Sequence, residues 1–500
     1  MSSFSELSQY ELDTAFADLL PLEYCVEKNI APLGKVPEGT AGPVTIGALT
    51  PGDTRLASEV EKQLRRTVRL VQLNAFEIRR ALAVIHQLPV AEDDSDAIAL
   101  DAGREIRFEP NQSPREILAD LLAVAIRTGA SDIHVESYPA DVDLRFRIDG
   151  VLRQVPTPLS PENAVRVISR LKVLCGVDFA ENRRALDGRF TTIFRENGVA
   201  RRIDLRVTFL PGPSGAEVAI RVLDRNRFIL DLDGLGISPD IAKRYRALTR
   251  MPHGLLLAVG PTGVGKTTTL YASVKSLQHD NVKIVTVEDP IEYEFTKVNQ
   301  KNVTRTMGFA DWLRTFLRAN PDVILVGEIR DSETAEIAVR AATTGHLILS
   351  TLHTGDAISA IGRLRALGAA DDFLSDVLVG VLAQRLVRKV CEACAEPCEP
   401  EEAVWRRFYD AKPKGTFRRG RGCAACAGTG YSGQTGVYEL LVRTEAIVSE
   451  IARGTTVPDL RHIARREGWV PLIEDALAKA AAGVTTLEDV ARKIGVKNPL

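Results

Sequence analysis

The sequence predicts an α/β protein with a mostly parallel sheet at its centre. Apolar segments at 255–259, 282–287, 323–326 and 347–352 each end in polar residues, and helix-forming segments separate them. This is the pattern of buried parallel strands. A second region of alternating strands and helices precedes these segments, and helical periodicity follows them. We therefore expect a parallel-sheet core, a smaller α/β domain before it and a helical C-terminal part.

The length, composition and net charge of the chain limit what kind of protein it is. A chain of 500 residues has room for about three or four domains. Its 45% hydrophobic and 26% charged residues are typical of soluble globular proteins, and its net charge of -2 argues against general nucleic-acid binding. The N-terminus is too polar for a secretory signal, and no apolar run approaches the roughly 20 residues of a membrane helix. We expect a cytosolic protein, or one held at a membrane by a partner.

Composition and periodicity divide the chain into consecutive parts. Residues 1–90 predict a small mixed docking domain, with a strand at 43–47 and helical spacing at 56–68 and 75–88. Residues 91–104 are acidic and predict a linker. Residues 105–228 predict the second α/β domain, where Ser113, Pro114 and Glu116 mark a helix start and Asp149-Gly150 marks a hairpin turn. Residues 235–390 predict the core.

A glycine-rich loop connects the strand at 255–259 to a predicted helix at 268–277. Gly260 is followed by four residues and then by Gly265-Lys266-Thr267, which is the pattern of a phosphate-binding loop. The glycines let backbone N–H groups face a phosphate, Lys266 can reach the β- and γ-phosphates, and Thr267 can bind Mg²⁺. The predicted ATP-binding residues of the loop are Gly260, Pro261, Thr262, Gly263, Val264, Gly265, Lys266, Thr267 and Thr268.

Carboxylates follow two of the predicted strands, at the edge of the sheet where ligands of parallel sheets bind. Glu328 can orient or deprotonate an attacking water, so we predict that it is catalytic together with Lys266. Glu288, Asp289 and Glu292, with Thr267, could bind Mg²⁺ directly or through water. Helix capping at Asp289-Pro290 is an equally good interpretation of this acidic group.

Histidine and arginine residues near the strands have two interpretations each. His353 could donate a hydrogen bond to the γ-phosphate or be a structural residue at a strand end, and His346 is a weaker candidate. Arg314 and Arg318 could reach a phosphate or a neighbouring subunit, or form a solvated helix face. Arginines near the strands of the second domain are most simply a solvated strand face.

Four cysteines form two closely spaced pairs, Cys391 with Cys394 and Cys423 with Cys426. Two such pairs predict a tetrahedral zinc site that has no open position and is therefore structural. Cys398 is a further thiol that could compete as a ligand. We therefore predict a tetracysteine zinc module at residues 391–430, followed by a helical subdomain at 431–500 with helices near 447–452, 458–467, 473–482 and 487–494.

These motifs together resemble those of the secretion and pilus motor ATPases. The matching phrases are GPTGVGKTT, TVEDPIEY, PDVILVGEIRD, TGHLILSTLHT and the paired cysteines, with Ala130-Ser-Asp-Ile-His-Val-Glu136 upstream. The resemblance covers about residues 105–500 and is to the type II secretion ATPase (GspE-type) and the type IV pilus assembly ATPase (PilB-type). It implies a RecA-like P-loop core that is preceded by a PAS-like α/β domain.

The resemblance also implies site residues and partners. It makes Arg206 and Arg221 candidate phosphate contacts from the second domain, and places His346 and His353 in one histidine box. It implies a cytoplasmic homohexamer that hydrolyses ATP with Mg²⁺, contains Zn²⁺, and has no nucleic-acid partner. Residues 1–90 would dock on a GspL-type inner-membrane protein, and a GspF-type platform protein would be driven.

Three functions remain open beside the leading one. The leading expectation is a motor that powers pseudopilus assembly and protein export in a type II secretion system. A type IV pilus assembly motor is the alternative, although such motors often carry a longer N-terminal region. A non-hydrolysing nucleotide-gated scaffold is disfavoured by Lys266 and Glu328, and a pilus-retraction motor is disfavoured by the tetracysteine module, which its relatives lack.

Overall fold

The computed structural model describes residues 10, 12–21, 24–25, 28–36, 42–73, 78, 81–82, 85, 100–101, 112–156, 159–178, 181–196, 199–224, 231–279 and 281–497. The chain divides into two compact units, one of residues 1–148 and 152–223 and one of residues 149–151 and 224–500. None of the described helices combines the length and the apolar composition that crossing a membrane requires.

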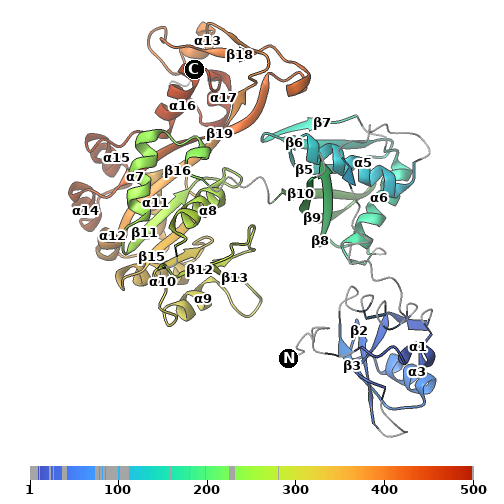
Figure 1. The fold of residues 1–500 in the computed structure, drawn as a ribbon. Coiled ribbons are helices and arrows are strands. Elements are labelled where there is room, and N and C mark those ends of the chain that lie inside the picture. The colour runs from blue at the N-terminus through green and yellow to red at the C-terminus, as the bar shows by residue number, and fades with distance from the viewer. Residues whose placement is uncertain are drawn as a thin grey trace. The chain divides into compact units, whose positions relative to one another are not determined.

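The N-terminal part of the first unit contains a three-stranded sheet, two strands of which, β2 and β3, are labelled in Figure 1. Its order is β1 (Ile30–Leu33), β2 (Val44–Ala48) and β3 (Val68–Gln72), preceded along the chain by the short helix α1 (Phe16–Leu19). The first pair is antiparallel and the second is parallel. The predicted strand at 43–47 is therefore confirmed within one residue.

Helix α3 (Thr54–Leu64) connects the two parallel strands. Asp53 caps it by accepting hydrogen bonds from two backbone N–H groups of the first turn. The helix ends at Arg65, which adopts a left-handed conformation with φ 53°. The prediction of helical structure as far as residue 68 is wrong, because Val68 begins a strand. The predicted helix at 75–88 lies mostly outside the described residues.

A seven-stranded sheet forms the remainder of the first unit. Its spatial order is β4 (Leu100–Asp101), β8 (Leu186–Glu196), β9 (Val199–Gly212), β10 (Gly215–Asp224), β5 (Ala130–Ser137), β6 (Val142–Ile148) and β7 (Val151–Gln154). The turn after β6 has positive φ at Asp149 and Gly150, as the predicted hairpin requires. Leu100 is buried and β4 pairs with β8, so these two residues of the predicted linker belong to the sheet.

Two helices, α5 (Pro114–Arg127) and α6 (Pro161–Leu174), pack on one face of this sheet (Figure 1). The predicted start of α5 is confirmed, because Ser113 and Glu116 form a complete capping box with proline in the first turn. Side chains alternate along β9, where Ile203, Leu205 and Val207 are buried under the helices. The intervening positions face away from the helices.

The second unit is built on another seven-stranded sheet, which is the predicted core. Its order is β13 (Asn299–Asn302), β12 (Ile284–Glu288), β14 (Val323–Val326), β15 (Leu347–Leu352), β11 (Gly254–Val259), β16 (Leu378–Val390) and β19 (Tyr431–Val442). The first six strands are parallel, and β19 is antiparallel to β16. Every residue of β11, β14 and β15 is buried, which explains their continuous apolar sequences.

Helices cover both faces of this sheet (Figure 1). Helices α7 (Pro239–Thr249) and α8 (Lys266–Leu277) share one apolar core with it. Helices α9 (Phe309–Phe316), α10 (Ser332–Thr343), α11 (Ala357–Ala366) and α12 (Asp371–Val377) share the other. Because the six strands from β13 to β16 are parallel, their carboxyl ends lie at one edge of the sheet, where the candidate site is found.

The C-terminal part begins with a strand, so the prediction that residues 431–500 are helical is wrong for residues 431–442. Gly436 interrupts the apolar pattern of β19, and the strand is stabilised by its long pairing with β16. The four predicted helices then follow within two residues of their predicted bounds. They are α14 (Glu445–Ala452), α15 (Val457–Arg466), α16 (Leu472–Ala481) and α17 (Leu487–Lys493).

The predicted tetracysteine module is the segment between β16 and β19. It contains the antiparallel pair β17 (Ala395–Pro397) and β18 (Arg418–Gly420), the short helix α13 (Glu402–Trp405) and the 3-10 turn η4 (Ala424–Cys426). The module therefore interrupts the connection between two paired strands of the core.

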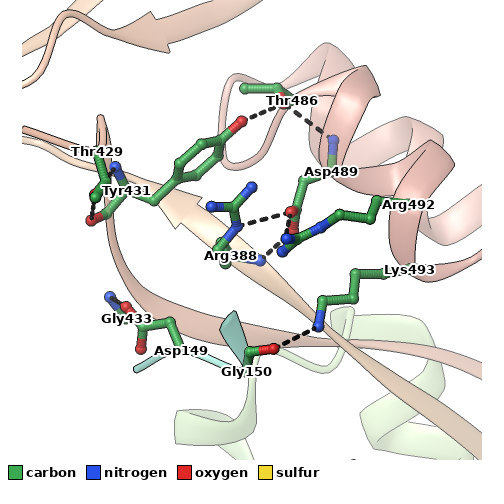
Figure 2. A network of polar contacts seen from close by, with 10 residues as sticks. All are labelled: Asp149, Gly150, Arg388, Thr429, Tyr431, Gly433, Thr486, Asp489, Arg492 and Lys493. Atoms are coloured by element: carbon green, nitrogen blue, oxygen red, sulfur yellow. Dashed lines mark hydrogen bonds and ion pairs between the residues drawn. The ribbon is translucent and has the colours of Figure 1, made fainter. Parts of the chain in front are cut away.

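A polar cluster fixes the base of this module to α17 (Figure 2). The Arg388 guanidinium stacks on the ring of Tyr431, 3.7 Å from its centroid, and its Nε donates to Oδ1 of Asp489 at 2.7 Å. The Tyr431 hydroxyl lies 2.8 Å from Oγ1 of Thr486. Asp489 is fully buried, and its charge is compensated by the guanidinium groups of Arg388 and Arg492 and by the backbone N–H of Arg388.

A candidate nucleotide site and a tetracysteine cluster

The glycine-rich loop connects β11 to α8 in the conformation that a phosphate-binding loop needs. Gly260, Gly263 and Gly265 all have positive φ, of 150°, 77° and 87°. A Cβ atom on Gly260 would lie 2.7 Å from the carbonyl oxygen of Gln384, so only glycine fits there. No side chain caps the first turn of α8, which begins at Lys266. Its N–H groups and its dipole are therefore available to an anion.

Lys266 lies over this loop and is buried. Its Nζ donates hydrogen bonds to the carbonyl oxygens of Gly260 at 2.7 Å and Pro261 at 2.9 Å. Burial lowers the pKa of Lys266 to about 8, the negative charge of Glu328 raises it, and the positive charge of Arg385 lowers it. The charge of the predicted catalytic carboxylate therefore acts on this ammonium group.

Glu328 follows β14, which is separated from β11 by β15 in the sheet. Its side chain is only 14% exposed, and its Oε2 lies 3.3 Å from Nε2 of His353. Its other oxygen pairs with Arg330. Gly327 continues the strand direction by donating to the carbonyl oxygen of Val287 at 2.8 Å. The structure therefore brings together Lys266, Glu328 and His353 at the carboxyl edge of the sheet.

The two candidate histidines lie at opposite ends of β15. His346 precedes the strand, where its Nδ1 lies 2.9 Å from the carbonyl oxygen of Ala341. His353 follows the strand and contacts Glu328. Six strand residues separate them, a distance of about 20 Å at the usual rise of a strand. The structure therefore places only His353 beside Glu328, and a functional role of His346, the weaker candidate, stays a prediction.

Glu288, one of the predicted magnesium ligands, is part of a buried hydrogen-bond network. The hydroxyl of Tyr271 donates to its Oε2. Thr286 Oγ1 and Gln300 Nε2 donate to its Oε1 at 2.6 and 3.1 Å. Since the side chain is 4% exposed, a metal would have to compete with these three donors. The structure favours a structural contribution, and the magnesium role stays a prediction.

The other predicted magnesium ligands are more accessible. Thr267 is exposed in the first turn of α8. The side chain of Asp289 is 46% exposed and lies 3.9 Å from Arg330. The backbone N–H of Glu292 donates to the hydroxyl of Tyr271 at 3.1 Å. These three residues are the better candidates for a metal that is held partly by water.

The candidate arginines divide between the two units. Arg206 and Arg221 belong to the first unit, on the sheet face that is opposite the helices, and Nε of Arg221 lies 3.4 Å from Asp132. In the second unit, Arg314 pairs with Glu333 at 2.5 Å, and Arg318 donates to the Arg314 carbonyl oxygen at 3.0 Å. Their phosphate contacts stay predictions.

Sequence reasoning missed Gln384 and Arg385, two consecutive residues of β16. The Gln384 side chain contacts the phosphate loop, and the Arg385 guanidinium donates to the carbonyl oxygens of Gln384 and Gly355 at 2.9 and 2.7 Å. Burial lowers the pKa of Arg385. The available signal was a polar pair inside an otherwise apolar segment, 378–387, that continues the series of core strands.

The four predicted zinc ligands lie together, with their sulfur atoms within 4.8 Å of one another. The Sγ–Sγ distances are 4.0 Å for Cys391 and Cys423, 3.9 Å for Cys394 and Cys426, and 3.8 Å for Cys423 and Cys426. Sulfur atoms around a tetrahedral zinc are separated by about 3.8 Å. Cys398 is outside this cluster. The four thiols therefore fit a structural zinc ion.

The family model described as "Type II/IV secretion system protein" matches residues 110–492, and the MshEN domain model matches residues 3–92. The chain belongs to the type II/IV secretion system protein family. The predicted family, the α/β fold class and the assignment as an ATP hydrolase of this family are confirmed.

Curated members of the secretion family match most of the chain. The type II secretion system protein E of Pseudomonas aeruginosa is 42% identical over 453 residues, 87% of this chain and 89% of that protein. The type II secretion system ATPase E of Vibrio cholerae is 38% identical, with coverage of 89% and 91%. The type IV pilus assembly ATPase PilB of Thermus thermophilus is 41% identical, with coverage of 75% of this chain and 42% of that protein.

One solved structure is also similar to this chain. The crystal structure of the pilus retraction motor PilT with bound ADP aligns with a TM-score of 0.51 and 29% identity, covering 75% of this chain and 95% of that chain.

Proposed function

We propose that this protein hydrolyses ATP to power pseudopilus assembly and protein export in a type II secretion system. The observation that carries this proposal is that Lys266, Glu328 and His353 follow three neighbouring parallel strands at one edge of the sheet, with His353 beside the carboxylate. A cation for the phosphates and a carboxylate for water are the two groups that phosphoryl transfer to water needs in one place.

Each residue of the site has a role in this reaction. The N–H groups of the glycine loop and Lys266 would bind the β- and γ-phosphates, and nucleotide would draw the Lys266 ammonium away from the carbonyl oxygens it now contacts. Glu328 would orient the attacking water and accept its proton, and His353 would hold the carboxylate in place. Mg²⁺ would neutralise charge on the phosphates, with Thr267, Asp289 and Glu292 as candidate ligands.

The tetracysteine cluster would hold one zinc ion in a structural role. Four thiolates leave no open position for a substrate, and the ion would fix the segment that connects β16 to β19. Two backbone N–H groups, of Cys423 and Gly430, donate to Sγ of Cys426 at 3.2 Å and support a thiolate there.

The fraction of each relative's length that this chain covers favours a function in secretion over one in pilus assembly. Both type II secretion relatives are covered over about nine tenths of their length, whereas PilB is covered over 42%. We infer further that the chain acts as a cytoplasmic homohexamer and binds a GspL-type inner-membrane protein through residues 1–90. A GspF-type platform protein would receive the motion. Arg206 and Arg221 would contact phosphate when the two units close.

Phosphate release from the purified full chain with Mg²⁺ and ATP tests the proposed activity. Wild type is expected to release phosphate, and Lys266→Ala is expected to lose both nucleotide binding and turnover. Binding without turnover in the wild type, at protein concentrations that form an oligomer, would instead favour a nucleotide-gated scaffold.

A further inference from the structure

Gln384 places its side-chain amide against the end of the phosphate loop. Its Nε2 donates to the carbonyl oxygen of Val264 at 2.7 Å, and its Oε1 accepts from Oγ1 of Thr269 at 2.8 Å. Val264 precedes Lys266 in the loop and Thr269 lies in the first turn of α8. One side chain from β16 therefore spans the segment that carries Gly265 and Lys266.

Both polar ends of the Gln384 amide form hydrogen bonds, which restricts the movement of the side chain. Gln384 is 1% exposed, and burying an amide is costly unless both of its polar ends are hydrogen-bonded. A Cβ atom on Gly265 would lie 3.3 Å from Nε2, so the amide also packs closely against the loop backbone. The side chain therefore fits one arrangement of the loop.

The contact to Val264 has a consequence for anion binding. When successive N–H groups of a loop face a phosphate, the carbonyl groups of the same loop point elsewhere and need donors of their own. Gln384 provides such a donor to the carbonyl oxygen of Val264. Losing it would leave a buried carbonyl without its partner and would permit other loop conformations.

We propose that Gln384 is a positioning residue, which holds the phosphate loop ready for nucleotide through Val264 and Thr269. The proposal rests on the proposed nucleotide function of this loop. Arg385, the next residue of β16, contacts a second loop, because its guanidinium donates to the carbonyl oxygen of Gly355 at 2.7 Å. Because His353 lies two residues before Gly355, one short segment of β16 contacts both loops at the site.

The test measures the affinity of the full chain for a non-hydrolysable ATP analogue with Mg²⁺. Gln384→Leu is expected to raise the Kd about tenfold, which corresponds to losing a buried hydrogen bond and orphaning its acceptor. Thr269→Val should raise the Kd by a smaller factor and Thr269→Ser should restore it. Adding Thr269→Val to Gln384→Leu should raise the Kd only slightly further, because the two residues share one contact.

Tyr245→Phe is the matched control. The Tyr245 hydroxyl is buried and lies 3.0 Å from Oγ of Ser273, one turn further along the same helix α8. This variant is expected to lower the thermal midpoint and leave the Kd unchanged. An unchanged Kd in Gln384→Leu, or an equal rise in Tyr245→Phe at the same loss of thermal midpoint, would overturn the proposal.

The same experiment also covers two other cases, a Gln384→Leu variant that does not fold and a wild-type protein that binds no analogue. If Gln384→Leu does not fold, equal affinities of Thr269→Val and wild type would overturn the proposal, and weaker binding that Thr269→Ser restores would support it. If wild type itself binds no analogue, the proposed function fails and this inference fails with it. Wild-type binding with unaffected variants removes only the role of Gln384.

Discussion

Oε2 of Glu328 lies 3.3 Å from Nε2 of His353, although the two residues follow different strands. This contact gives the carboxylate a fixed partner at the carboxyl edge of the sheet. His353→Ala is expected to lower kcat by about tenfold or more while nucleotide affinity changes less, because the histidine acts on the group that activates water. The measurement is steady-state phosphate release together with nucleotide binding.

His346→Ala is the control for this prediction. His346 lies at the other end of β15 and contacts Ala341, so its loss should affect stability and leave kcat nearly unchanged. Equal losses of kcat in both histidine variants would show that the contact to Glu328 is not the reason for the effect.

The affinity for nucleotide should depend on the protonation of Lys266. Burial lowers the pKa of Lys266 to about 8 in the nucleotide-free protein, so its ammonium is lost as the pH rises through this value. Above it, the Kd for ATP should rise by about tenfold per pH unit until the pKa of the bound state is reached. Phosphate groups ionise at about pH 6, so they do not titrate in this range.

Lys266→Arg separates charge from geometry in that experiment. A guanidinium stays protonated at these pH values, so this variant should bind ATP more weakly than wild type at neutral pH but with a flat pH profile. A pH-independent Kd in wild type between about pH 7 and 9 would contradict the lowered pKa.

Glu439 should make the stability of the second unit depend on pH. Its carboxylate is 2% exposed and accepts N–H bonds from Ala357 at the start of α11 and Leu472 at the start of α16, both at 2.6 Å. Burial nevertheless raises its pKa from 4.5 to about 7. The folded protein thus binds the proton more tightly than the unfolded chain does. The free energy of unfolding should fall as the pH rises from about 4.5 to about 7.

Glu439→Gln removes this titration. The free energy of unfolding of the variant minus that of wild type should therefore become more positive across the same pH range, by at most about 1.4 kcal/mol per pH unit. Chemical unfolding at several pH values measures this difference, and Glu445→Gln at an exposed position serves as the control. A difference that does not change with pH would contradict the raised pKa.

The tetracysteine cluster predicts one zinc ion per chain. Cys391→Ser should lose the ion and lower the stability of the second unit, because the thiolates join the two ends of the segment between β16 and β19. Metal analysis of the purified protein measures the content. Cys398→Ser, outside the cluster, should keep the zinc, and a folded wild-type protein without metal would refute the site.

The parts of the fold that were predictable from sequence are those with strong local patterns. The strands at β11, β14 and β15 are continuous apolar runs because both faces are buried, and the start of α5 carries its own capping residues. Strand β19 was missed because glycines interrupt its pattern and its stability comes from pairing with β16, which is distant along the chain.

The site was predictable where motif and strand end coincide, as at Lys266 and Glu328. Gln384 was missed because its partner is a backbone carbonyl, which has no signature in the sequence. The resemblance placed His346 and His353 in one motif. The sequence did not show that the strand β15 lies between them and puts them at its opposite ends. Glu288 shows the opposite case, since its acidic side chain suggested a metal but lies in a network with Tyr271, Thr286 and Gln300.

Glu328→Gln tests the central claim most directly. The amide keeps the size of the side chain but cannot accept a proton from water, so ATP should bind with nearly the wild-type Kd while phosphate release falls by about a hundredfold or more. Unchanged phosphate release in Glu328→Gln, with ATP still bound, would contradict the account.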